Sequence, residues 1–132
     1  MNTRVPIAVP RPTVLIAEPE PPEALSTRKL VIETGKFNVL TAHSSEETLE
    51  LIELFPKLDA VVFVEALAKA ACPAMVAKIR KKKANAPIII LSPRIGYACK
   101  GANRVLSSHD PQALLGVLRE LFGDPRVLAD PK

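Results

Sequence analysis

The sequence predicts an α/β domain in which helices cover both faces of a doubly wound parallel sheet. Short, continuous apolar runs recur along the chain, the form expected of strands that are buried on both faces. These runs alternate with segments of helical periodicity, which is typical of right-handed βαβ units. The length of 132 residues, with 48% apolar residues, suits one domain with a buried core.

Five segments are expected to be strands. In chain order they are TVLIA (13–17), FNVLTA (37–42), AVVFV (60–64), IIIL (88–91) and RVLS (104–107). The third is hydrophobic throughout, so we place it at the centre of the sheet. Ligands of such sheets bind beyond the carboxyl ends of the strands. A functional site is therefore expected in the loops 18–22, 65–72, 92–100 and 107–111.

Two helices are predicted in the first half of the chain. The first covers about 23–35 and ends at Gly35, a residue type that favours the position after a helix. Ser44 and Glu47 form a capping box that begins the second helix. The residues expected on the buried face of that helix are Thr48, Leu51, Ile52 and Phe55.

Two further helices are predicted in the second half. The region 66–84 is rich in alanine, and Pro73 within it suits the first turn of its main helix, with Met75, Val76 and Ile79 inward. Asp110 and Pro111 begin the last helix, which Gly123 ends. Its inward residues are Leu114, Leu115, Leu118, Leu121 and Phe122. We thus expect a flexible arm over 1–12, the folded domain over 13–123 and a tail over 124–132.

The net charge of +4 is unevenly distributed. Residues 1–66 contain six Lys/Arg and ten Asp/Glu, a net charge of −4. Residues 67–132 contain twelve Lys/Arg and four Asp/Glu, a net charge of +8. The densest basic cluster, within 78–83, is suited to an anionic partner. Cations on a solvated helix face and near a helix C-terminus also explain this cluster without any partner.

The sequence indicates a cytoplasmic protein without membrane contact. No apolar stretch approaches the roughly 18 residues of a membrane span. The first residues lack the apolar segment of a secretory signal. Cys72 and Cys99 are far apart in the sequence and have no neighbouring His, so we expect reduced, buried thiols and neither a disulfide framework nor a zinc site.

Five segments, taken in order, resemble the receiver domains of bacterial response regulators in two-component signalling. They are VLIAEPEPPEAL, TAHSSEETLELI, LDAVVFV, APIIILSP and GANRVLSSHDPQALLGVLREL, and the resemblance spans about residues 13–122. It implies a flavodoxin-like (βα)5 fold with strand order 2-1-3-4-5. It also implies a stand-alone role in phosphorelay signal transduction.

The residues that carry receiver chemistry are mostly replaced. The acidic pair that holds Mg²⁺ in the family falls on Glu18 and Pro19, and the phosphoacceptor aspartate falls on Val64. The hydroxyl residue that contacts the phosphoryl group is kept as Ser92, but the conserved lysine of the family falls on Ser108. The switch aromatic falls on Val105. The comparison implies a degenerate pseudo-receiver site without a phosphoacceptor.

Mg²⁺ binding is expected to be lost with that site. Glu18 and Glu20 are the remaining candidate ligands, but Pro19 has no side-chain oxygen. Mg²⁺ requires near-octahedral oxygen geometry, so the loss of one carboxylate ligand is serious. We therefore expect no cofactor and no catalytic residues, and thus no enzyme.

Glu65 raises an alternative, because a shift of one residue would place it at the acceptor position. Such a shift would turn a different set of strand residues inward. Asp59, five residues before Val64, also fits the spacing of the family. We expect Glu65 to line the surface or a loop. The alternative is a bulge that turns it into the site as a permanent negative charge.

A docking surface is the other candidate feature. Only PRIGYACK (93–100) separates Ser92 from Gly101, where the family has its fourth helix, so that helix is expected to be shortened or absent. The edge of the fifth strand is then open to a partner or to a second copy of the chain. Tyr97 is either an interface anchor or a ring folded over the core. The interface candidates are Tyr97, Arg94, Lys81, Lys82, Lys83 and Val105.

Three functional hypotheses follow. The first is a phosphorylation-independent module that binds a kinase, regulator or output protein of a signalling pathway. The second is a receiver that is still phosphorylated, or permanently charged, through Glu18 or Glu65. The third is nucleic-acid binding through the basic helix 74–84, which we do not expect because aromatic residues for base stacking are missing at useful spacing.

Overall fold

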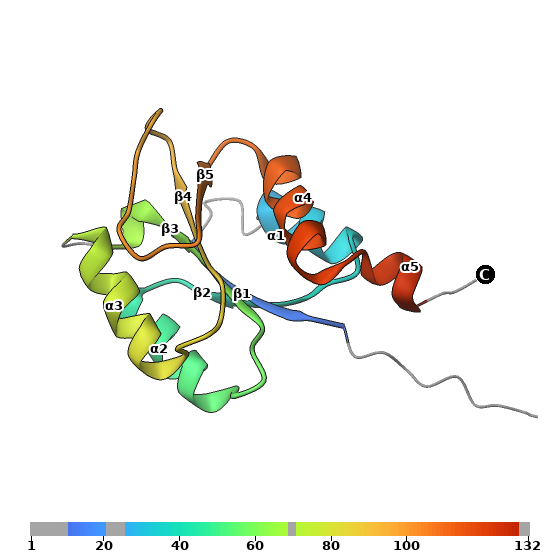
Figure 1. Ribbon diagram of the computed structural model, residues 1–132, viewed down its shortest axis with the longest axis horizontal. Helices are drawn as coiled ribbons and strands as arrows, with labels where there is room; N and C mark the ends of the chain where they lie inside the picture. Colours follow the sequence, from blue (N-terminus) through green and yellow to red (C-terminus); the bar gives the residue numbers. More distant parts are fainter. Residues whose placement is uncertain (1–10, 21–25, 69–70, 130–132) are drawn as a thin grey trace, which may run out of the picture.

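A five-stranded parallel sheet forms the centre of the molecule, as predicted. The computed structural model describes residues 11–20, 26–68 and 71–129. The strands are β1 (Thr13–Ala17), β2 (Asn38–Ala42), β3 (Ala60–Val64), β4 (Ile88–Ser92) and β5 (Arg104–Ser107). Their order is β2-β1-β3-β4-β5, with all neighbours parallel (Figure 1). The prediction of a doubly wound sheet with β3 at its centre is confirmed.

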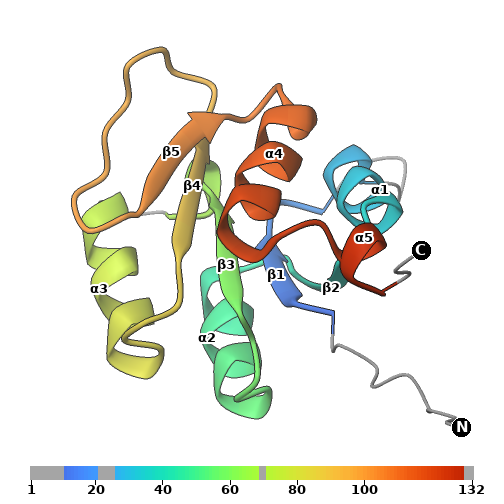
Figure 2. The same cartoon turned by 45° about the vertical axis from the view of Figure 1, so that its right-hand side comes forward.

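Helices cover both faces of this sheet. α2 (Ser45–Leu54) and α3 (Cys72–Lys82) lie side by side on one face. α1 (Thr27–Thr34) and α4 (Pro111–Phe122) pack together on the other, followed by the short α5 (Pro125–Ala129) (Figures 1 and 2). α5 lies within residues 124–132, which were predicted to form a tail.

The alternation of side chains along each strand divides the core in two. On the central strand, Val61 and Phe63 join the cluster beneath α2 and α3, whereas Val62 and Val64 join the cluster beneath α1 and α4. All five residues of β3 are buried, because successive side chains point to opposite faces and both faces are covered. Burial on both faces explains the unbroken apolar run in the sequence.

The first helix ends at Gly35, as predicted. It begins at Thr27, directly after Ser26, whose hydroxyl caps the amide of Lys29 at 3.1 Å. Residues 23–25 of the predicted range lie outside the described residues. The left-handed residue after the helix is Lys36, with φ 72°, and Gly35 has φ −75°. Gly35 is instead required by close packing: a Cβ there would lie 2.6 Å from Leu115 Cδ1.

The predicted start of α2 is confirmed, but one of its inward residues is wrong. The Ser44 hydroxyl accepts from the amide of Glu47, and the Glu47 carboxylate accepts from the amide of His43. Thr48 and Ile52 are buried as expected. Phe55 is 44% exposed, because it follows the last helical residue and the chain there leaves the helical path.

The region predicted as one interrupted helix forms two elements. A single 3₁₀ turn, η1 (Glu65–Leu67), follows β3 directly, and α3 begins only at Cys72, with Pro73 in its first turn. Residues 69 and 70 lie outside the described ranges. The inward residues of α3 are Met75, Val76 and Ile79, as predicted.

The connection from β4 to β5 contains no helix. Residues 93–103, all of them described, form turns and extended chain, and Figure 2 shows them as a long loop beyond the sheet. This confirms the expected loss of the fourth helix of the family. In the last helix, Asp110 caps the amide of Ala113 and Gly123 ends the helix at φ 82°. Among the described residues, α4 is the longest helix, and no helix is long and apolar enough to cross a membrane.

Candidate functional site

The carboxyl edge of the sheet brings four of the predicted site positions together. Glu18 follows β1, Val64 ends β3, Ser92 ends β4 and Ser108 follows β5, on neighbouring strands. Val64 is 5% exposed and belongs to the apolar cluster beneath α1 and α4. Its isopropyl group offers neither a nucleophile nor a metal ligand. The centre of this edge is therefore apolar.

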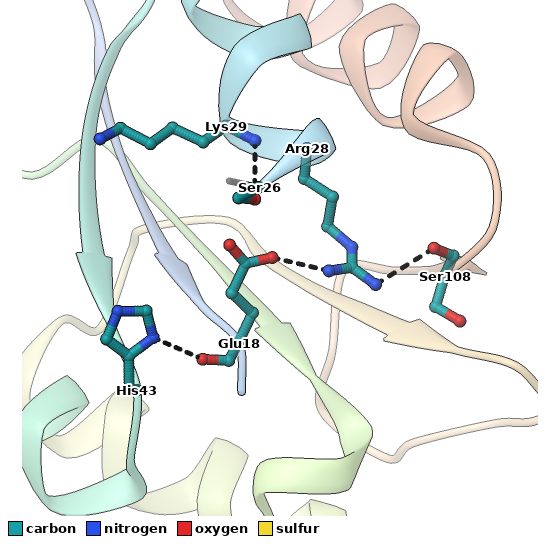
Figure 3. A network of polar contacts seen from close by, with 6 residues as sticks. All are labelled: Glu18, Ser26, Arg28, Lys29, His43 and Ser108. Atoms are coloured by element: carbon teal, nitrogen blue, oxygen red, sulfur yellow. Dashed lines mark hydrogen bonds and ion pairs between the residues drawn. The ribbon is translucent and has the colours of Figure 1, made fainter. Parts of the chain in front are cut away.

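An ion pair occupies the β1 side of the site. Arg28 Nη1 lies 2.6 Å from Glu18 Oε1, and Arg28 Nη2 donates to the Ser108 carbonyl at 3.2 Å (Figure 3). Glu18 is 1% exposed, whereas 24% of the Arg28 side chain is exposed. The guanidinium thus joins the end of β1 to the end of β5. It neutralises a carboxylate that is almost fully removed from water.

The local sequence explains why Arg28 reaches this position. It lies in the first turn of α1, whose N-terminus faces the carboxyl edge because each helix of the sheet returns antiparallel to the strands. The Ser26 cap fixes that first turn. On the other side of Glu18, its carbonyl oxygen lies 3.0 Å from His43 Nδ1 (Figure 3). Contacts with His43 and Arg28 therefore fix both the backbone and the side chain of Glu18.

A hollow of about 550 Å³ opens beside this ion pair. Pro19 and Glu20 lie on its rim and are exposed. Among the described residues, its lining consists of Glu18, Pro19, Glu20, Ser26, Thr27, Arg28, Val64, Ser108, His109 and Pro111. No group of three or more His, Cys, Asp or Glu side chains within the described ranges is arranged to hold a metal ion.

A second polar cluster lies on the β4 side of the edge. The Ser92 hydroxyl donates to Glu65 Oε1 at 2.6 Å and accepts from the amide of Arg94 at 3.0 Å. Arg94 Nη2 also forms an ion pair with Glu65 Oε2. Hydrogen bonds from Arg94 and Ser92 hold the pKa of Glu65 below its usual value, so this carboxylate stays ionised.

Glu65, expected to line the surface or a loop, lies in the turn after β3 and contacts Arg94 of the β4–β5 loop. Its side chain is 17% exposed and turns toward Ser92. The 3₁₀ turn that follows β3 makes this possible, because it redirects the chain directly after Val64. No bulge or shift of register is involved: Val64 pairs with Leu91 in regular parallel register.

Arg94 connects the cluster to an aromatic ring and two thiols. Its guanidinium carbon lies 4.3 Å from the centre of the Tyr97 ring, a cation–π contact. Tyr97 packs on the core beneath α3, the second of its two predicted alternatives. Cys72 and Cys99 are buried in the same cluster as predicted, and they are not joined by a disulfide. Burial, and after it contact with Cys72, raises the pKa of Tyr97 and that of Cys99 to about 12.

The remaining interface candidates lie away from this edge or along β5. Val105 on β5 is half-buried against the core. Lys81 and Lys82 are exposed at the end of α3, and Lys82 Nζ lies 2.9 Å from Glu53. Lys83 donates to the carbonyl of Pro56. These lysines lie at the amino edge of the sheet, opposite the carboxyl edge (Figure 2).

Sequence reasoning missed Arg28 altogether. No motif marks it, because receivers carry their site cation at the end of the fifth strand, the position of Ser108 here. The available signal was positional: a cation in the first turn of α1 is unfavourable next to the helix dipole unless an anion lies nearby. The buried Glu18 carboxylate is that anion.

Comparisons with known proteins bear on the fold. No family model matches the sequence, and no curated protein matches it. Among solved structures, a response-regulator receiver domain protein from Clostridium thermocellum is similar, with 22% identity and a TM-score of 0.70 over 89% of this chain and 98% of that one.

Two further structures give the same result. The signal receiver domain of an HD-domain-containing protein from Pseudomonas fluorescens Pf-5 has 20% identity and a TM-score of 0.71, over 89% of this chain and 98% of that one. A chain of the CheX–CheY–BeF₃–Mg²⁺ complex from Borrelia burgdorferi has 21% identity and a TM-score of 0.69, over 84% of this chain and 89% of that one. With the strand order and the two helical layers, these similarities establish that the chain has the flavodoxin-like fold of response-regulator receiver domains.

Proposed function

We propose that the chain is a signalling module of a two-component or phosphorelay pathway, acting in the cytoplasm through protein contacts and without aspartyl phosphorylation. The observation that carries this proposal is Val64. It lies buried at the carboxyl end of the central strand, where a receiver needs its phosphoacceptor. A valine side chain cannot accept a phosphoryl group.

The surrounding charges also argue against Mg²⁺. The fold family implies that ion, but the residues present do not fit it. Glu18 is already neutralised by Arg28, Pro19 offers no oxygen, and Glu20 is exposed on the rim of the hollow. A guanidinium held against the first carboxylate repels a divalent cation at short range. We therefore propose neither a bound metal ion nor an enzymatic activity for this site.

The partner is proposed to be a protein. CheY of Borrelia burgdorferi, which shares the fold, is found in complex with CheX. A receiver fold without phosphorylation keeps its surfaces, and partner binding can shift its conformational populations. A kinase, a regulator or an output protein of the pathway would be such a partner.

Intact-mass spectrometry tests this proposal. The protein is incubated with Mg²⁺ and a small acyl phosphate, and we expect no mass increment of one phosphoryl group. A Val64→Asp variant is then treated in the same way. A receiver domain with its phosphoacceptor aspartate serves as the positive control. A phosphoryl adduct on the unaltered chain, mapped to Glu18 or Glu65, would refute the proposal and establish the second hypothesis from the sequence.

A second candidate function has its own observation: the contact of 2.6 Å between Ser92 Oγ and Glu65. The hydroxyl at the end of β4 is the one expected to contact a phosphoryl group in the family. In this chain it contacts a permanent carboxylate. Glu65 would thus hold the β4–β5 loop in a single state, as a phosphoryl group does on demand in a receiver.

Hydrogen exchange of the β4–β5 loop distinguishes this second candidate. Glu65→Gln keeps the shape but removes the charge that pairs with Arg94. If Glu65 fixes the loop, exchange should accelerate across 93–103 and remain unchanged in β2, which serves as internal control. Unchanged exchange across the loop would mean that Glu65 is only a surface partner of Arg94.

A further inference from the structure

The two cysteines of the chain are far apart in the sequence but meet in the fold. Cys72 is the first residue of α3, and Cys99 lies in the β4–β5 loop (93–103). Both are buried, at 3% and 6% exposure, in the core cluster beneath α2 and α3. The side chains of the two cysteines are in direct contact. Contact between two thiols on separate segments is the arrangement from which a disulfide can form.

The backbone of the loop also lies directly on α3 at this point. A Cβ at Gly101, which has φ 94°, would lie 3.0 Å from Val76 Cγ1. Val76 shares one face of α3 with Cys72, one helical turn away. Figures 1 and 2 both show the loop running beside the start of this helix. The contact of the two thiols is thus part of a wider close approach between the loop and α3.

Side chains that precede Cys99 in the loop help to cover the thiols. Tyr97 contacts Cys72 and packs on the same core cluster. The guanidinium carbon of Arg94 lies 4.3 Å from the centre of the Tyr97 ring, and Arg94 pairs with Glu65 in the turn after β3. Because both thiols are buried, an oxidant can reach them only when this part of the loop opens.

The other side of Cys99 is held by α3 itself. Arg80 Nη2 donates to the carbonyl of Gly101 at 3.3 Å and also to the side chain of Asn103. The helix that carries Cys72 therefore anchors the loop just beyond Cys99. Two thiols that are held close together react with each other faster than either reacts with a thiol of another molecule.

We propose that Cys72 and Cys99 form a reversible oxidation site, in which a hydroperoxide converts the two thiols into a disulfide that fastens the β4–β5 loop to the first turn of α3. One sulfur, as thiolate, attacks the peroxide, so that an S–O bond forms and the O–O bond breaks. The second sulfur attacks the resulting sulfenic acid, and hydroxide leaves and takes up a proton. In total, two thiols and one hydrogen peroxide give one disulfide and two waters, and two electrons pass from sulfur to oxygen.

The closed loop should protect the reduced pair. Burial, and after it contact with Cys72, raises the pKa of the Cys99 thiol to about 12. The thiolate is the nucleophile, so a closed loop slows the reaction at neutral pH. Opening of the loop lets water reach Cys99 and removes the main cause of this raised pKa. The contacts of Arg94 therefore control the rate of oxidation.

This oxidation site goes beyond the proposed function and does not depend on it. Val64, which carries that proposal, takes no part in the reaction. In a reducing compartment, such as the cytoplasm proposed above, disulfides are usually transient and redox-sensing. Oxidation would fix the loop that carries Arg94 and the fully exposed Ile95, so that a surface of the chain would respond to peroxide.

Mass spectrometry of the full chain provides the first measurement. The reduced protein is treated with hydrogen peroxide at neutral pH, and free thiols are then alkylated in denaturant. We expect a monomer that has lost two hydrogen atoms and takes up no alkyl group, and the return of both thiols after reduction with dithiothreitol. Trypsin without reduction should release residues 70–78 joined to residues 95–100.

Matched variants test the role of the loop. Glu65→Gln removes the charge that pairs with Arg94 and should accelerate disulfide formation about tenfold. Glu120→Gln makes the same chemical change in the exposed pair with Arg104 and should leave the rate unchanged. Thermal unfolding shows that each variant is folded. In the unaltered chain, oxidation should raise the unfolding midpoint by about 5–10 °C, because the bridge constrains the unfolded state.

Several results would overturn the oxidation site. They are disulfides that only link separate chains, oxidation that stops at the sulfinic acid of one cysteine, and thiols that react only in urea. Equal rates in Glu65→Gln and Glu120→Gln would overturn the role assigned to the loop. A phosphoryl adduct after treatment with acyl phosphate would refute the proposed function and leave the oxidation site intact, so the two can fail separately.

Discussion

Arg28 Nη1 lies 2.6 Å from Glu18 Oε1, and through this contact a helix residue supplies the cation that the end of β5 lacks. Ser108, at the lysine position of the family, contributes only its carbonyl oxygen, which accepts from Arg28 Nη2. The Arg28 guanidinium, in α1, therefore neutralises charge at this edge in place of a side chain from β5. Through these two contacts Arg28 joins the end of β1 to the end of β5.

Removal of this guanidinium should destabilise the fold. Arg28→Ala leaves the Glu18 carboxylate, which is 1% exposed, without its ionic partner. We expect a loss of about 2–3 kcal/mol in the free energy of unfolding, because an unpaired buried charge is costly and Arg28 itself is partly exposed. Urea unfolding followed by circular dichroism measures this loss.

Two variants make that result specific. The double variant Arg28→Met, Glu18→Gln replaces the ion pair by uncharged side chains. Much of the lost free energy of unfolding should therefore return. Arg104→Ala breaks the exposed pair of Arg104 with Glu120, at 3.3 Å, and should have a much smaller effect. Equal losses in Arg28→Ala and Arg104→Ala would show that the buried pair has no special importance.

The attachment of the β4–β5 loop should depend on pH. The pKa of Glu65 is lowered by its hydrogen bonds to Arg94 and Ser92. A group with a lowered pKa in the folded state contributes its full stabilisation above its ordinary pKa, which is 4.5 for this carboxyl, and loses it as pH falls through the lowered value. The loop contacts should therefore persist at neutral pH and loosen only in acid, below pH 4.5.

Amide chemical shifts of residues 93–103, followed by NMR during an acid titration, report this change. The matched control is Glu65→Gln, in which the titration of these shifts should disappear. Arg94→Ala should move the midpoint upward, toward the ordinary carboxyl value, because the largest cause of the lowered pKa is removed. A midpoint that does not move in Arg94→Ala would contradict this account.

The sequence predicts the sheet better than it predicts the site. Buried parallel strands leave an unmistakable pattern, because continuous apolar runs such as 60–64 and 88–91 satisfy two helical layers at once. Helix starts at Ser44 and Asp110 were also predictable, since a side-chain cap acts over three residues. These features depend on neighbours in the sequence.

The site depends on contacts between distant residues, and those left no local signal. Arg28 reaches Ser108 across 80 positions, and Ser92 reaches Glu65 across 27. Phe55 was placed inward because helical periodicity was extended one residue beyond the true end of α2. Gly35 was predicted to end the first helix, but the need for its small size opposite Leu115 of α4 left no local signal. Tertiary packing decided each of these positions.

Tyr97 should titrate at unusually high pH. Burial first, and then contacts with Cys72 and the nearby carboxylate of Glu65, raise its pKa to about 12. The chain has one Tyr and no Trp, so ultraviolet absorbance of tyrosinate reports this ring alone. The native protein should show a midpoint near 12, and the protein unfolded in urea a midpoint near the ordinary value of about 10.

This shift also has a consequence for stability. Because the folded state raises the pKa, the contribution of Tyr97 is complete below pH 10 and is lost as pH rises toward 12. Tyr97→Phe should remove that part of the alkaline loss, and circular dichroism at each pH confirms that the native fold is being titrated. A native midpoint equal to that of the unfolded chain would place the ring in solvent, contrary to its packing on the core.

Two alanine substitutions for glycine should have opposite effects on stability. A Cβ at Gly35 would lie 2.6 Å from Leu115 Cδ1, so Gly35→Ala must displace a buried leucine of α4 and should cost about 1–3 kcal/mol. A Cβ at Gly116, within α4, meets no atom within 4 Å. Gly116→Ala should therefore stabilise the fold by about 0.5–1 kcal/mol, since alanine loses less backbone entropy in a helix.

Thermal or urea unfolding of both variants, alongside the unaltered chain, measures the two effects. The pair controls for the chemical change, because each variant adds the same methyl group and neither glycine has a positive φ. If Gly35→Ala proves as stable as the unaltered chain, α1 and α4 would have to pack less closely than the contact with Leu115 indicates. Combining Gly35→Ala with Leu115→Val, which withdraws part of the opposing side chain, should then recover stability only if that contact causes the loss.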